Sequence, residues 1–250
     1  MSEHVDLNGD VGEGIGQDPE LMPQLTSANV ACGGHAGDGA TMRQTVALAR
    51  AHGVAVGAHP SFPDREGFGR RALPLPPHEV EVSVSAQIRE LAAVAASQQV
   101  PLRHVKPHGA LYNMAARDAR LADAIARAVA SVDPSLILVG LAGSALVEAG
   151  ARAGLQTANE GFADRAYTPA GTLVPRDAPG AVIHDPALFA ERAVAMVRDG
   201  AVSAIDGSRV ALTVDTICVH GDTPGAAALA KAVRQALARA GIEVAAIGSR

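Results

Sequence analysis

The chain has 250 residues, of which 48% are hydrophobic but only 2% aromatic, and its formal net charge is −5. This length is enough for one large domain with a substantial core, and the acidic balance disfavours nucleic-acid binding, which needs a basic surface. No apolar run approaches a membrane span, and no charged-then-apolar leader precedes the first predicted strand, so we expect a soluble cytoplasmic protein. Cys32 and Cys218 lie in apolar runs outside any Cys-x-x-Cys pair and are expected to be buried, reduced thiols.

Taken in chain order, short apolar strands alternate with amphipathic helices. Strands are expected at 5–7, 27–31, 54–58, 102–105, 136–139, 155–158 and 210–219, with a small extra strand within 242–247. Helices are expected at 41–52, 78–98, 118–130, from 143 onward, 186–199 and 224–240. Two irregular segments, 61–77 and 167–180, interrupt this order, and loops of such length are often functional.

The strand–helix alternation predicts an α/β protein with a parallel sheet. Polar clusters follow the strands and never the helices, as in (β/α) barrels, whose active sites lie at the carboxyl ends of the strands. An open doubly wound sheet would use only the loops at one crevice. Because six strand ends carry polar clusters, we favour a single TIM-like barrel of seven strands over residues 1–250.

Acidic and amide residues surround the first predicted strand. Asp6, Asn8 and Asp10 occupy alternate positions, and Glu13 follows closely. Alternate residues of a strand face the same side, so the first three could converge inside the barrel. Ordinary turn chemistry is the alternative, because Asn, Asp and Gly are common in loops.

Histidines follow several of the apolar strands. They are His35 with Asp38, His59, His108, and His220 with Asp222. With Asp10, the residues His35 and His59 could bind a divalent metal such as Zn, Mn or Fe. A closely spaced motif such as His-Glu-x-x-His is absent, so loop stabilisation or metal-free ligand binding remains open.

Positive charge is predicted near the same end of the barrel. Lys106 follows one strand, and Arg70 and Arg71 lie in a glycine-rich loop where they could bind carboxylate or phosphate. Glu160, Asp164 and Arg165 follow another strand, although exposed arginines are usually just solvated. The nucleotide-binding loops Gly-x-x-x-x-Gly-Lys-Ser/Thr and Gly-x-Gly-x-x-Gly are absent, as is the Gly-x-Ser-x-Gly elbow. Any ATP site would therefore be unconventional.

Several segments resemble, in order, sequence blocks of the LamB/YcsF family. These segments are 6–13 (DLNGDVGE), 27–38 (SANVACGGHAGD), 57–64 (GAHPSFPD), 67–71 (GFGRR), 106–113 (KPHGALYN), 162–167 (FADRAY) and 216–222 (TICVHGD). Gly9 and Gly161 depart from the family pattern without removing an ionisable group. The resemblance covers nearly the whole chain, and blocks of this length are highly specific.

The resemblance implies an ATP-dependent 5-oxoprolinase, which hydrolyses 5-oxo-L-proline to L-glutamate while ATP, with Mg²⁺, becomes ADP and phosphate. It also implies that this chain is the A subunit beside partner subunits B and C, with a fold similar to the polysaccharide deacetylase barrel. Two other hypotheses stay open: a metal-dependent amidohydrolase or deacetylase that needs no ATP, and a non-catalytic substrate-binding subunit.

The candidate residues divide into two groups under this hypothesis. The catalytic candidates are Asp10, Glu13, His35, Lys106, His108 and Glu160. The candidates for binding substrate or phosphate are Asp6, Asn8, Asn29, His59, Arg70, Arg71, Asn113, Asp164, Arg165, His220 and Asp222. An acid or a histidine of the first group would act as general base toward water.

Overall fold

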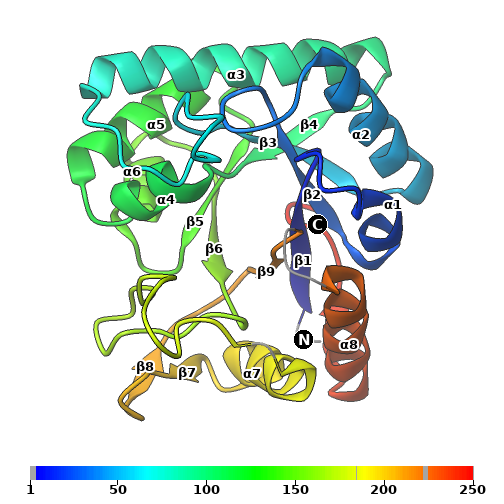
Figure 1. The fold of residues 1–250 in the computed structure, drawn as a ribbon, viewed down its shortest axis with the longest axis vertical. Helices are drawn as coiled ribbons and strands as arrows, with labels where there is room; N and C mark the ends of the chain where they lie inside the picture. The colour runs from blue at the N-terminus through cyan, green and yellow to red at the C-terminus, as the bar shows by residue number, and fades with distance from the viewer. Residues whose placement is uncertain (1–3, 184, 222–224, 250) are drawn as a thin grey trace.

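The computed structural model describes residues 4–183, 185–221 and 225–249. Within these ranges, seven parallel strands close into a barrel, because the first strand pairs with both the second and the last barrel strand (Figure 1). In order around the ring, these strands are β1 His4–Val11, β2 Ser27–Ala31, β3 Ala55–His59, β4 Leu102–Val105, β5 Ile137–Leu141, β6 Thr157–Gly161 and β9 Thr216–Val219. The predicted seven-stranded, TIM-like α/β barrel is confirmed.

Helices surround the barrel (Figure 1). They are α1 Asp18–Leu21, the 3-10 helix η1 Met22–Gln24, α2 Gly39–His52, α3 Pro77–Ser97, α4 Gly109–Ala115, α5 Ala119–Val132, α6 Ala145–Arg152, α7 Pro186–Arg198 and α8 Ala226–Arg239. Local signals explain the bounds of α2: Asp38 accepts a hydrogen bond from the Thr41 amide at its start, and Gly53 adopts a left-handed conformation at its end. The helices pack small aliphatic side chains against the strands, as the low aromatic content requires.

The first strand is longer than predicted. The sequence indicated a strand at 5–7 and a loop after it, because turn-forming residues occupy 8–10. In the structure β1 continues through this segment, with Asn8 paired to Ser27 on one side and to Cys218 on the other. Pairing on both edges satisfies the backbone of this segment, so tertiary structure overrides the local turn preference.

The single strand predicted at 210–219 is wrong. Two strands occupy this region: β8 Arg209–Ala211 pairs antiparallel with β7 Ala201–Ser203 outside the barrel, whereas β9 belongs to the ring. The predicted short strand near the C-terminus is confirmed as β10 Glu243–Val244, which pairs with the beginning of β1. The sequence did not predict α1 or α4.

The irregular segment 60–76 packs across the carboxyl ends of β2 and β4. Arg65 donates to the carbonyl oxygens of Gly33 and Gly37 at 3.0 and 2.8 Å. Farther along, the amide of Ala110 donates to the Gly69 carbonyl. The segment is thereby fixed against two strand-end loops and forms part of the site wall.

Two expectations about the chain as a whole can be compared with the structure. Cys32 and Cys218 are free thiols and both are buried, as predicted. Among the described residues, none of the helices has the length and hydropathy needed to cross a bilayer.

Candidate active site

Alternate residues of β1 point into the barrel. Asp6, Asn8 and Asp10 are all buried there. The Asn8 amide donates to Glu160 Oε1 at 3.0 Å, and Asn29 Nδ2 of β2 lies 2.7 Å from Asn8 Oδ1 and 2.8 Å from Asp10 Oδ1. These amides join polar groups of three strands into one network inside the barrel.

Asp6 lies at the deep end of this network. Its carboxylate accepts hydrogen bonds from the hydroxyls of Thr26, Ser27 and Thr216. Burial raises its pKa even though these hydrogen bonds favour the ionised form. Asp6 therefore ties β1 to both neighbouring strands.

Lys106 brings a positive charge to the centre of the barrel. Its ammonium lies 2.8 Å from Glu160 Oε1, 3.0 Å from Asp10 Oδ1 and 3.0 Å from Cys218 Sγ. Burial alone would lower the pKa of Lys106, but the neighbouring carboxylates, Asp10 foremost, hold it well above its ordinary value. Burial likewise opposes ionisation of Asp10, yet His59 and Lys106 hold its pKa well below the usual range. A buried ion pair therefore lies beneath the site.

Glu160 is held through both of its oxygens. Oε1 contacts Lys106 and Asn8, and Oε2 accepts a hydrogen bond from the Tyr112 hydroxyl at 2.7 Å. Burial and Glu160 raise the pKa of Tyr112 well above its ordinary value, so the hydroxyl remains a donor. The sequence hypothesis did not include Tyr112, although it lies in the block 106–113 that carried the resemblance.

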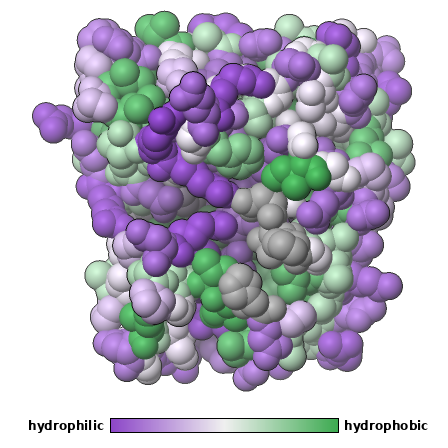
Figure 2. Space-filling view, in the orientation of Figure 1, coloured by the Kyte–Doolittle hydropathy of each residue, from purple (hydrophilic) through white to green (hydrophobic). Residues whose placement is uncertain are grey.

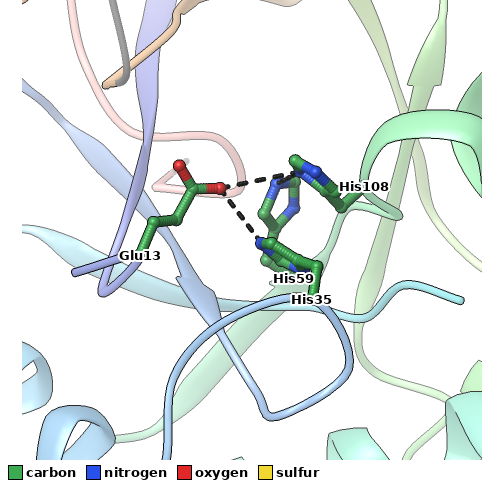
Figure 3. A group of neighbouring side chains, drawn as sticks. All are labelled: Glu13, His35, His59 and His108. Carbon is green, nitrogen blue, oxygen red and sulfur yellow. Dashed lines mark hydrogen bonds and ion pairs between the residues drawn. The ribbon is translucent and has the colours of Figure 1, made fainter. Parts of the chain in front are cut away.

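A histidine cluster lies beside this ion pair. Its members are Glu13, His35, His59 and His108, whose nearest ligand atoms all lie within 4.8 Å of one another (Figure 3). His35 Nε2 is 3.0 Å from Glu13 Oε1, and His59 Nε2 is 3.0 Å from His108 Nδ1. Burial lowers the pKa of His35 to about 3 and that of His108 to about 2, so both rings are neutral at neutral pH. Neutral imidazoles and a carboxylate are a donor set that a transition metal prefers.

The predicted metal candidates divide between two groups of residues. His35 and His59 belong to the histidine cluster, whereas Asp10 belongs to a second group with Cys218 and His220. The connection between them is the 3.5 Å separation of Asp10 Oδ2 and His59 Nε2.

A cavity of about 840 Å³ opens above the ion pair. Its volume is within the range of small-molecule sites. Its walls include Asp10, His59, Lys106 and His108 at the base. Four arginines also line it: Arg70, Arg117, Arg165 and Arg176. On the face shown in Figure 2, hydrophilic residues gather near the middle.

The irregular segment 167–180 forms one wall of the cavity through its residues 173–177. Arg165 holds this segment, since its guanidinium donates to the Val174 carbonyl at 2.6 Å. Nearby, His220 Nδ1 lies 2.7 Å from Asp164 Oδ2, and its ring stacks on Phe162. The residues predicted after β6 and β9 therefore meet on the same side of the cavity.

The remaining candidates have different surroundings. Asn113 lines the cavity and donates to the Gly109 carbonyl. The Arg71 side chain is 58% exposed, pairs with Asp64, and does not contribute to the cavity wall formed by the described residues. Asp222 lies outside the described residues. Adjacent arginines of similar sequence context therefore have separate roles, with Arg70 alone of the two on the cavity.

Cys218 and two arginines, Arg117 and Arg176, also belong to the site although the sequence hypothesis omitted them. Cys218 could have been recognised from the period of two on β9, which it shares with Thr216 and His220. No local pattern indicates Arg117 or Arg176, because the folding of distant segments brings them to the cavity.

Residues 5–250 match the model of the LamB/YcsF family. The chain belongs to the LamB/YcsF family. Relatives named as the A subunit of 5-oxoprolinase include proteins of Chloroflexus aggregans, 57% identical over 96% of this chain and 97% of the relative, and of Methylococcus capsulatus, 54% identical over 99% and 97%. The resemblance stated from the sequence blocks is thereby confirmed.

Solved structures agree with this LamB/YcsF assignment. The crystal structure of the lactam utilization protein from Thermus thermophilus aligns with a TM-score of 0.92 at 49% identity, covering 98% of this chain and 100% of that one. A structure described as T48 deacetylase with substrate aligns with a TM-score of 0.51 at 15% identity, over 97% and 87% of the two chains. The second likeness shows that the LamB/YcsF barrel shares its fold with a deacetylase.

Proposed function

We propose that this chain is the lactam-hydrolysing A subunit of an ATP-dependent 5-oxoprolinase that also contains subunits B and C. The 57% identity to a relative of that name, over nearly the full length of both chains, carries the proposal. The proposed reaction converts 5-oxo-L-proline, ATP with Mg²⁺, and water into L-glutamate, ADP and phosphate.

The chemistry explains why ATP is consumed. Resonance stabilises the lactam amide and makes its carbonyl carbon a poor electrophile. Transfer of the terminal phosphoryl group of ATP to the carbonyl oxygen releases ADP and makes this carbon electrophilic. Water then adds to the carbon, the ring nitrogen leaves as the amine, and the ring opens to an acyl phosphate. A second water hydrolyses the acyl phosphate to glutamate and phosphate.

The charges of the cavity suit such a substrate. The carboxylate of 5-oxoproline and the phosphoryl group are both anionic, and guanidinium groups bind such groups in a bidentate manner. In this proposal Arg70 and Arg176 on the wall bind these anions, and the Lys106 ammonium at the base stabilises negative charge on the reacting oxygen.

Asp10 is the proposed general base toward water. Its Oδ1 is held by Lys106 and Asn29, which leaves Oδ2 facing the histidine cluster at the cavity base. The lowered pKa keeps the carboxylate ionised at neutral pH and able to accept a proton. Glu160, which touches Lys106 on the side away from the cavity, is a positioning residue.

The direct test measures glutamate release from 5-oxo-L-proline with ATP and Mg²⁺, by this chain alone and with subunits B and C. We expect release in the complete mixture, and loss of most turnover in Asp10→Asn and His108→Ala. Lys231→Met, on the exposed face of α8, is the control substitution. The absence of glutamate from the complete mixture would overturn the proposal. Near-normal turnover in both site variants would instead remove the roles given to these residues.

A further inference from the structure

Hydrogen-bond partners determine the tautomers of two histidines in the cluster. Carbonyl oxygens only accept, so His59 Nδ1, 2.7 Å from the Lys106 carbonyl oxygen, carries a proton. His108 Nε2, 2.9 Å from the Phe68 carbonyl oxygen, carries one for the same reason. In neutral rings the other two nitrogens, His59 Nε2 and His108 Nδ1, present lone pairs, and they lie 3.0 Å apart. Two lone pairs at that distance repel each other unless a cation lies beside both.

A carboxylate completes this arrangement. Glu13 Oε1 lies 3.6 Å from His108 Nδ1 and within 4.8 Å of the ligand nitrogen of His59 (Figure 3). In a tetrahedral zinc site with bonds of about 2.0–2.1 Å, neighbouring ligand atoms are about 3.3 Å apart. The separations of 3.0 and 3.6 Å lie on either side of that value. The three atoms are therefore spaced as ligands of one small cation.

His35 has a different role in the cluster. Its ring is stacked on that of His108, with centroids 3.7 Å apart and planes 4° from parallel. In this position its lone pair cannot point to an ion that lies in the plane of the His108 ring. Its Nε2 instead lies 3.0 Å from Glu13 Oε1, where an N–H group holds the carboxylate in place. His35 thus positions a ligand, as outer-shell groups of metal sites do.

We propose that Glu13, His59 and His108 form a binding site for a divalent transition-metal ion such as Zn²⁺, with His35 positioning Glu13. Two imidazoles and one carboxylate leave the fourth tetrahedral position for water, which is the ligand set of catalytic zinc sites. The carbonyl groups of Lys106 and Phe68 orient the two rings. His59 and His108 also line the cavity, so the ion would face the bound substrate. The inference rests on these contacts and not on the identity of the substrate.

Metal binding is tested on the full-length chain after chelator treatment. Zn²⁺ or Co²⁺ is added, excess ion is removed by desalting, and bound metal is measured by mass spectrometry and by the visible absorption of Co²⁺. We expect one ion per wild-type chain and loss of binding in His59→Ala and His108→Ala. His35→Ala should retain the site with an affinity reduced about 10–100-fold. The exposed His78→Ala is the matched control and should bind like wild type.

Two measurements keep the result clear if a variant is unstable. Circular dichroism shows which variants are folded, and ¹⁵N NMR of the wild-type imidazoles shows whether His59 Nε2 and His108 Nδ1 shift when Zn²⁺ is added. The proposal is overturned if the wild-type chain binds neither ion, with a proton bridging the two nitrogens instead. Binding that persists after both histidines are replaced would also overturn it. These readouts are independent of glutamate release, so this site and the proposed function can fail separately.

Discussion

Removal of the Lys106 ammonium tests the buried ion pair directly. In Lys106→Met the side chain keeps its length, but Asp10 and Glu160 lose a cation at 3.0 and 2.8 Å. Removing one partner of a buried ion pair typically costs about 3–5 kcal/mol, because the remaining charge is buried without compensation. For a chain of this size, 1 kcal/mol lowers the Tm by about 2–4 °C, so we expect a decrease of about 6–20 °C.

Thermal unfolding followed by circular dichroism at neutral pH measures this effect. Lys231→Met is the matched control and should change the free energy of unfolding by less than about 0.5 kcal/mol, since Lys231 is exposed. Glu160→Gln in the Lys106→Met background removes one uncompensated charge. The double variant should therefore be more stable than the sum of the single changes predicts, by about 0.5–3 kcal/mol. A Tm of Lys106→Met equal to that of the control would refute the reasoning.

Two further predictions concern residues away from the ion pair. Gly57→Ala would place a Cβ 2.1 Å from His104 Nε2, and we expect such overpacking to cost about 1–3 kcal/mol. Urea unfolding should show this loss beside Gly39→Ala, whose Cβ has no neighbour closer than 3.4 Å, and equal stability of the two variants would contradict it. The hydrogen bond from Arg71 holds the pKa of Asp64 below its usual value, so its stabilising effect is present above the unfolded pKa and lost as pH falls through the folded pKa. The Tm deficit of Arg71→Gln should therefore be largest near neutral pH and shrink toward pH 3, and a deficit independent of pH would argue against this pair.

Much of the barrel could be predicted because its signals are local. Each strand after the first is a short apolar run of a few residues, and a polar cluster marks its carboxyl end. The period of two along β1 is enough to place Asp6, Asn8 and Asp10 on one side of the strand. Parallel strands bring their carboxyl ends together, so the presence of a shared site followed from the topology.

Errors arose where tertiary pairing competes with local preference. The segment 8–10 has turn-forming residues, yet it is a strand because both of its edges are paired. The apolar run 210–219 is interrupted because its first part pairs with β7 and only its last part enters the barrel. Pairing partners lie far away in sequence, so no local pattern contains them.

The sequence by itself determined the class of fold and the residue types that meet at the strand ends. Only the tertiary structure decided how those residues share the work. Arg70 and Arg71 are neighbours in sequence, but one faces the cavity and the other pairs with Asp64. The carbonyl groups that set the tautomers of His59 and His108 belong to the backbone of other segments. Side-chain direction and backbone acceptors depend on the path of the whole chain, whereas hydrophobic period and residue type are properties of each segment alone.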